Sequence, residues 1–156
     1  MSTSEKHPAA VAHAAPAAAA ARPHSGPVEW HHLVRWLHAD GVISATEAQR
    51  TTARCSQAES AQNALVRLAS VAMERLSDGK AIDIEMLTEY LARRAGLEYL
   101  RIDPLRVDVG RVADTMSAVY AERHKVLPVQ VSAKEVVVAT AEPFITDWVA
   151  EVERQA

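Results

Sequence analysis

The stretch from Leu87 to Phe144 decides the fold: LTEYLARRAGLEYLRIDPLRVDVGRVADTMSAVYAERHKVLPVQVSAKEVVVATAEPF. Its apolar residues recur at helical spacing before Gly96 and at strand spacing after it. The order of patterns predicts helix, strand, helix, strand and strand, and a last helix follows towards Ala156. We therefore expect an α/β (α+β) fold, in which a helical N-terminal part precedes a small βαββα unit.

The strands of this unit are expected at residues 97–102, 126–131 and 135–139. The last of these is rich in valine and apolar on both faces, so we expect it at the centre of the sheet. Pro128 has no N–H group to donate to a neighbouring strand, which favours an edge strand or a strand start for its segment.

The helices around these strands have recognisable ends. Asp83 is placed to cap a helix that stops at Gly96. Asp108 is placed to cap one continuous helix with its end near His124. Pro143 suits the first turn of the final helix, since that position needs no N–H donor.

The βαββα unit is expected to be incomplete. A strand and helix beside a central strand normally lead back to the sheet through a further parallel strand. The sequence ends at Ala156 before such a strand, so we expect the natural domain to continue beyond it.

Three helices are predicted ahead of the decisive stretch. The first begins near Val28 and has Trp36 at the edge of an apolar face formed by Trp30, Leu33, Val34 and Leu37. Ser44 and Glu47 have the spacing of a capping box and predict the second helix. The third carries a stripe that consists of Leu65, Leu68, Ala69, Ala72 and Leu76.

The chain begins with an alanine- and proline-rich segment. His13 and Pro16 interrupt its apolar run, which disfavours a cleaved signal peptide and favours a low-complexity tail. We therefore expect a disordered tail over 1–27, a helical subdomain over 28–96, and a small α/β subdomain over 97–156 that is truncated at its C-terminus.

Composition excludes several classes of protein. The net charge of the 156 residues is -3, so no basic field is available to hold a nucleic-acid backbone. Cys55 is the single cysteine, which rules out an internal disulfide and a cysteine-rich zinc site. No apolar run reaches the ~20 residues that span a bilayer, so direct membrane insertion is not expected.

The seven histidines raise the question of a metal site. Three lie in the expected tail, three on the first helix and one at a helix end: His7, His13, His24, His31, His32, His38 and His124. Neighbouring histidines on a helix point in divergent directions, and no HExxH pattern accompanies them. We expect no metal and no other cofactor.

The remaining motifs give no sign of catalysis. The five glycines form no GxxxxGK[ST], GxGxxG or GxSxG pattern. Cys55 has no base close to it in sequence and is expected to be a small core residue. Trp30 and Trp36 suit either the core or an exposed interface, and the core is favoured.

Several short segments of the second half together resemble a known family. They are Leu91–Leu97, Tyr99, Ile102–Leu105, Val107–Asp108, Glu122–His124, Leu127–Val129 and Val136–Phe144. Their order and spacing over about 60 residues are similar to the N-terminal domain of type II secretion and type IV pilus assembly ATPases.

The first half resembles this family more faintly. The segment from Leu33 to Ser44 is similar to the opening helix and turn of such domains, and some family members bind cyclic di-GMP through an Arg-Leu-Gly step there. In this chain His32 replaces the arginine and Val34 the glycine, and Cys55 stands where a glutamine is expected. The resemblance therefore leaves cyclic di-GMP sensing as an alternative that departs from the motif.

The resemblance implies a docking or regulatory domain without a catalytic site of its own. It would link a cytoplasmic motor to the inner-membrane platform of a secretion or pilus machine, by binding the cytoplasmic domain of a platform protein. The chain would be cytoplasmic and peripheral to the inner membrane, and a homo-oligomer could form through a motor domain that this sequence lacks. The candidate contact residues are Trp30, Leu33, Trp36 and Leu37.

Overall fold

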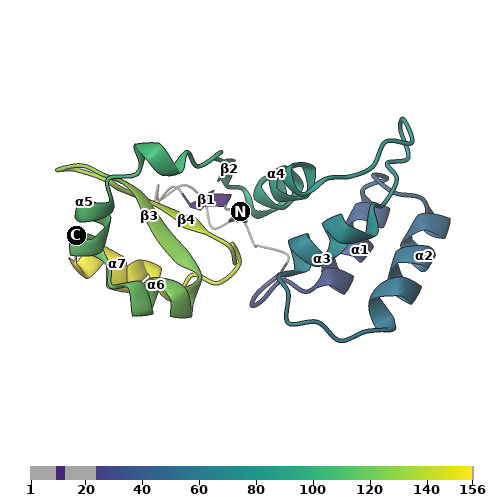
Figure 1. Ribbon diagram of the computed structural model, residues 1–156, viewed down its shortest axis with the longest axis horizontal. Helices are drawn as coiled ribbons and strands as arrows, with labels where there is room; N and C mark the ends of the chain where they lie inside the picture. The colour runs from purple at the N-terminus through teal and green to yellow at the C-terminus, as the bar shows by residue number, and fades with distance from the viewer. Residues whose placement is uncertain (1–9, 13–23, 156) are drawn as a thin grey trace, which may run out of the picture. The chain divides into compact units, whose positions relative to one another are not determined.

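A computed structural model describes residues 10–12 and 24–155 of the chain (Figure 1). The chain divides into two compact units, and the boundary lies between Thr88 and Glu89. The helical unit comprises 28–88, and the sheet unit comprises 89–155 and the described residues before Val28.

The helices and strands follow one another along the chain as β1 (Ala10–Ala12), α1 (Trp30–Ala39), α2 (Ala45–Ser56), α3 (Ala64–Val71), α4 (Ile84–Ala95), β2 (Glu98–Tyr99), the 3-10 turn η1 (Pro104–Arg106), α5 (Val109–Thr115), α6 (Ala118–His124), β3 (Val126–Val131), β4 (Val136–Thr140) and α7 (Val149–Gln155). The mixed α/β class with a helical N-terminal part is as the sequence predicts.

Helix α1 ends where the sequence predicts, because Gly41 takes a φ of 73° that other residues avoid. Ser44 caps α2 by accepting a hydrogen bond from the Glu47 N–H at 3.1 Å. Helices α1, α2 and α3 pack against one another. Their buried face is completed by Thr51 and Cys55 from α2.

Helix α3 is shorter than its apolar stripe suggests. Ala72 takes a left-handed conformation with φ of 54°, and this ends the helix. The chain then forms a turn in which Gly79 has φ of 69° and Glu74 pairs with Ala81. Leu76 therefore lies outside the helix and is exposed, so its expected place in the buried stripe is wrong.

The sheet has four antiparallel strands in the order β2-β1-β4-β3. Strand β4 lies inside the sheet, as its valine-rich sequence predicts, and β3 lies at the edge, as Pro128 predicts. The register between β3 and β4 shifts between Pro128 and Gln130, which leaves Val129 as an extra residue.

Strand β1 comes from the N-terminal segment of the chain. Residues 1–9 and 13–23 of the expected disordered tail lie outside the described residues, but Ala10–Ala12 between them form a strand. This strand pairs with β4 in antiparallel orientation, on the side opposite β3. The position beside the central strand is thus filled from the N-terminal segment of the chain.

The helix expected from Asp108 to His124 is two helices. Met116 has an extended backbone with φ of -149° and ψ of 132°, and its side chain is buried. Ser117 then caps α6 by accepting a hydrogen bond from the Tyr120 N–H at 3.2 Å. Burial of Met116 and the new cap at Ser117 thus interrupt the expected continuous helix.

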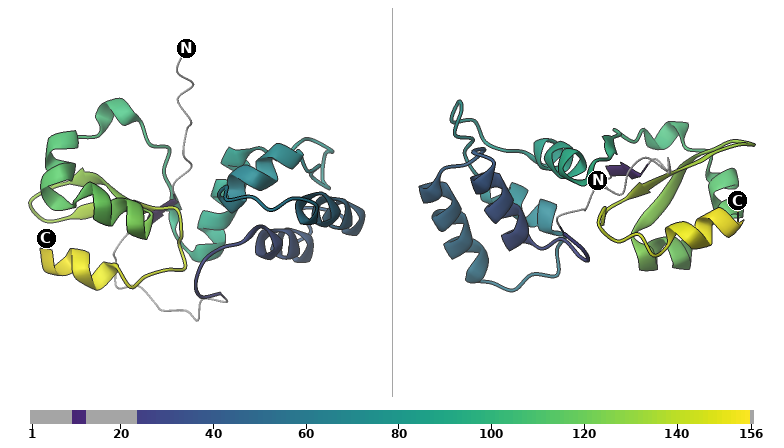
Figure 2. Two further views of the ribbon diagram at one scale, coloured as in Figure 1. Left: turned by 60° about the horizontal axis from the view of Figure 1, so that its bottom comes forward. Right: turned by 180° about the vertical axis from the view of Figure 1, so that it is seen from behind.

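The core of the sheet unit lies on one face of the β3–β4 hairpin, where α6 and α7 pack (Figure 2). Its buried members are Met116, Val126, Val138 and Trp148. The final helix begins at Val149, so the expected start at Pro143 is wrong. The Trp148 indole N–H donates to the Ile145 carbonyl at 2.9 Å, which fixes the turns before the helix. No helix in the described parts of the chain is long and apolar enough to cross a membrane.

Candidate functional site

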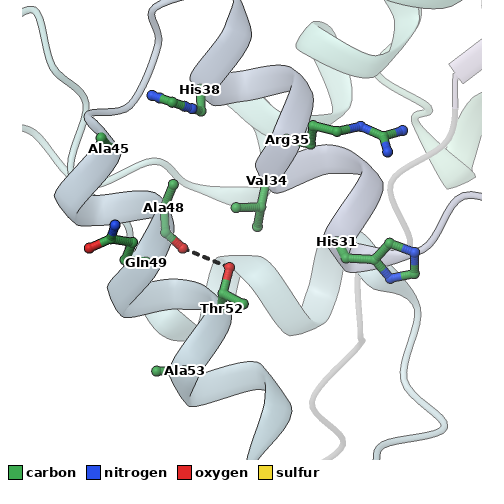
Figure 3. Close-up of a pocket in the computed structure, with 9 residues that line it drawn as sticks. All are labelled: His31, Val34, Arg35, His38, Ala45, Ala48, Gln49, Thr52 and Ala53. Carbon is green, nitrogen blue, oxygen red and sulfur yellow. Dashed lines mark hydrogen bonds between the residues drawn. The ribbon is translucent and has the colours of Figure 1, made fainter.

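A groove of about 580 Å³ runs between α1 and α2 of the helical unit (Figure 3). Val34 points from α1 towards α2, and small alanine side chains leave the space open on the α2 side. The lining residues are His31, Val34, Arg35 and His38 from α1, and Ala45, Ala48, Gln49, Thr52 and Ala53 from α2.

The polar side chains that line this groove can form hydrogen bonds, but no nucleophile lies beside a general base among them. The Thr52 hydroxyl already donates to the Ala48 carbonyl at 2.8 Å. Arg35 extends from α1 on the side away from α2, whereas Gln49 and His38 flank the groove (Figure 3). The Arg35 guanidinium therefore does not face the groove in this conformation, and Gln49 and His38 are the polar groups beside it.

Arg67 of α3 connects the three helices behind the groove. Its guanidinium donates to the carbonyls of Cys55 and Ala58 at the end of α2, and it lies 5.6 Å from the ring centroid of Trp30. Burial raises the pKa of the Cys55 thiol, and the neighbouring Arg67 opposes that shift. The thiol is therefore protonated at neutral pH and suits a core residue rather than a nucleophile.

The contact residues predicted from the sequence lie mostly in the core. Leu33, Trp36 and Leu37 are each at most 5% exposed, so they cannot serve as contact residues in this conformation. They are buried because α1 presents this face to α2 and α3. Only Trp30 is partly accessible, and its ring also packs with Arg67.

The structure brings His31 and His32 together, where divergent directions were expected. Their ring centroids are 4.3 Å apart, and Glu29 Oε2 lies 3.3 Å from His31 Nε2. Ligand atoms of all three residues lie within 4.8 Å of one another.

This cluster is explained by helix capping. His32 Nδ1 accepts a hydrogen bond from the Glu29 N–H at 3.1 Å, and the two residues form a reciprocal capping box. A metal bound through Nδ1 would displace that bond. A metal bound through Nε2 would require a proton on Nδ1, where the Glu29 N–H already points. Capping of α1 therefore accounts for the cluster of Glu29, His31 and His32, and cation binding does not.

The sheet unit exposes large apolar side chains that the sequence analysis did not select. Leu105 in η1 is 95% exposed, Val119 in α6 is 77% exposed and Val109 in α5 is 71% exposed. Both valines fall within the single helix expected from Asp108 to His124, where their spacing would place them on one apolar face with Met116. The break at Met116 removes them from that face, so no periodicity in the sequence could have indicated their exposure.

Comparison with known proteins finds a family model and a curated relative that match part of the chain. Residues 95–156 match the MshEN domain, and this match begins at the end of α4. The resemblance to the N-terminal domain of type II secretion and type IV pilus assembly ATPases is thereby confirmed. A particular relative is the type IV pilus assembly ATPase TfpB of Acinetobacter baylyi, which is 39% identical over 74 residues. These residues cover 47% of this chain and 13% of the relative. No solved structure matches the chain.

Proposed function

We propose that this chain is an N-terminal docking or regulatory domain of a type II secretion or type IV pilus assembly ATPase. The match of residues 95–156 to the MshEN domain carries the proposal, and a curated relative named as a pilus assembly ATPase supports it. The partner would be the cytoplasmic domain of a platform protein in the inner membrane. The chain would then be cytoplasmic and peripheral to that membrane.

The exposed apolar residues of the sheet unit support a docking role. Single exposed apolar side chains are common on protein surfaces, whereas a contiguous group of them marks a protein-binding surface. Leu105 and Val109 are four residues apart across η1 and the start of α5, within the MshEN match. We expect them, rather than the buried residues of α1, to meet the partner.

ATP hydrolysis would belong to a different domain. The chain contains no GxxxxGK[ST] pattern that could cradle a triphosphate. It would contribute position and regulation to a motor, and any homo-oligomer would form through that motor domain.

Co-purification tests the proposal directly. The chain, carrying an affinity tag, is incubated with the cytoplasmic domain of a platform protein from the same organism at concentrations on the order of tens of micromolar. We expect retention of the platform domain. Its failure to bind there would overturn the docking role, since weak transient contacts are still visible at these concentrations.

A second candidate function rests on the groove between α1 and α2. Arg35 lines the groove from α1 and would have to turn its guanidinium towards α2 to pair with a phosphate of cyclic di-GMP, and Gln49 could bind a base edge. Two features differ from the binding motif. Val34 occupies the groove where a glycine would let the backbone approach, and the His32 ring is already stacked on Trp36 at 5.8 Å.

Calorimetry separates this candidate from docking alone. If the groove binds the nucleotide, titration gives heat that Arg35→Ala abolishes. Arg54→Ala is the matched control, because Arg54 is exposed on α2 but does not line the groove. A flat titration of the unmodified chain would remove the candidate.

A further inference from the structure

The first turn of α1 is closed by a histidine. His32 Nδ1 accepts a hydrogen bond from the Glu29 N–H at 3.1 Å, and this bond is half of the capping box at the start of the helix. The residue at this position of a capping box is usually Glu or Gln. Histidine differs from both because its charge changes near neutral pH. The start of α1 therefore depends on the protonation state of one imidazole ring.

The hydrogen bond exists in only one form of this ring. His32 Nδ1 can accept a bond from a backbone N–H only while it carries a lone pair, which places the ring proton on Nε2. A second proton turns Nδ1 into a donor, and the Glu29 N–H would then face another donor. The bond is lost in that form, and the Glu29 N–H has to find water or another acceptor.

A positive charge is also poorly placed at this end of a helix, because the free N–H groups of the first turn carry partial positive charge. Among the described contacts of this cap, the other charged or titratable groups are Glu29, His31 and Arg67 of α3. The His31 ring lies 4.3 Å from the His32 ring, and the Arg67 guanidinium lies 5.6 Å from the ring of Trp30. Glu29 Oε2 lies 3.3 Å from His31 Nε2. A proton on His31 would thus face a carboxylate, whereas a proton on His32 Nδ1 would face the Glu29 N–H.

The same turn determines how the chain enters the helical unit. Val28 and Leu33 occupy the two positions of a hydrophobic staple, before and after the N-cap, and they are 8% and 0% exposed. His31, on the same turn, lines the groove between α1 and α2 at the end away from His38 (Figure 3). Release of the cap would therefore loosen the entry of the chain and change one end of the groove.

We propose that the hydrogen bond from the Glu29 N–H to His32 Nδ1 is a pH-sensitive latch at the start of α1. The latch is closed while the His32 ring is neutral, and it opens when the ring takes up a second proton. The unfolded chain binds this proton more readily than the latched helix, so the latch contributes stability that is lost as the pH falls below about 6.5, the ordinary range of histidine. The proposal depends neither on a docking partner nor on a nucleotide.

NMR of the full chain tests the latch. The nitrogen shifts of the His32 ring report its tautomer, and hydrogen exchange of the Glu29 amide reports the bond. The unmodified chain, His32→Gln and His38→Gln are compared at pH 8 and at pH 5. Glutamine is an ordinary capping-box residue that accepts the same bond and does not titrate. His38→Gln is the matched control, because His38 lies in the last turn of α1, away from the cap.

At pH 8 we expect the tautomer of His32 that carries its proton on Nε2. Between pH 8 and pH 5, the protection of the Glu29 amide, corrected for its intrinsic exchange rate, should fall at least about fivefold in the unmodified chain and in His38→Gln. It should change by less than about twofold in His32→Gln.

Protection of the Glu29 amide that stays the same from pH 8 to pH 5 in the unmodified chain would overturn the proposal. So would a proton on His32 Nδ1 at pH 8, or an equal loss of protection in His32→Gln.

Discussion

At the scale of single residues, exposure separates leucines that the sequence alone treats alike. Leu33 of α1 has no exposed surface, whereas Leu105 of η1 is almost entirely exposed. The first is held in a three-helix core, and the second follows a proline in a short turn. Leu33 therefore contributes to the stability of the helical unit, whereas Leu105 is accessible to a partner.

Substitution of Leu33 by alanine should lower the free energy of unfolding by about 2–5 kcal/mol, because it removes buried methyl groups and leaves a cavity. Leu105→Ala is the matched control and should change it by less than about 0.5 kcal/mol. Urea unfolding followed by circular dichroism measures both. Equal small effects would show that Leu33 is not in a packed core.

The pKa of the Asp78 carboxyl should lie well below the ordinary value of an aspartate. A side-chain hydrogen bond from Arg75, helped by the Lys80 backbone N–H, lowers the pKa of Asp78 from 3.8 to about 2. The ionised form therefore favours the folded chain above about pH 4, and this contribution is lost as the pH falls towards 2.

Carbon-detected NMR of the side-chain carboxyl measures this pKa directly. Arg75→Gln should raise the pKa of Asp78 towards 3.8, whereas Arg50→Gln, which removes a partner of Glu47, should leave it unchanged. An Asp78 that titrates near 3.8 in the unmodified chain would contradict the observed pairing.

At the scale of helices and strands, the ends of elements are decided by local side-chain caps. Ser44 starts α2 and Ser117 starts α6, and each hydroxyl accepts a hydrogen bond from a backbone N–H three residues later. The first cap was evident in the sequence because Glu47 follows it and an apolar face follows both. The second was hidden within an apolar stripe that suits one long helix.

Replacement of Ser44 by alanine should destabilise the chain by about 1 kcal/mol, because it leaves the Glu47 N–H without its side-chain acceptor. Ser56→Ala, at the exposed end of the same helix, should change the stability by less than about 0.5 kcal/mol. Thermal unfolding compares the two variants. A neutral Ser44→Ala would mean that α2 does not depend on this cap.

Much of the fold could be predicted from periodicity and breakers. The glycines at 41, 79 and 96, the central β4 and the edge strand with Pro128 all follow from short-range rules. The break at Met116 and the role of β1 could not be predicted, because both depend on contacts between distant segments. The structure buries three of the four candidate contact residues in α1, Leu33, Trp36 and Leu37, for a related reason. An apolar helical face indicates burial or docking equally well until its neighbours are known.

At the scale of the whole molecule, different observations support the proposed docking role of the sheet unit and the proposed nucleotide site of the helical unit. The MshEN match covers residues 95–156 of the sheet unit, and the groove between α1 and α2 lies outside it. The sheet unit exposes Leu105 in η1 and Val109 at the start of α5. These exposed apolar residues suit a protein that binds other proteins, and they give the docking proposal a specific surface.

The affinity of the chain for the cytoplasmic domain of a platform protein tests this central claim most directly. The measurement compares the unmodified chain with Leu105→Glu plus Val109→Glu, and with Leu76→Glu as a control that places the same charge on an exposed leucine of the helical unit. The account predicts saturable binding that the double variant weakens at least about tenfold and that the control leaves intact. Absence of binding, or equal affinity for the double variant and the control, would contradict it.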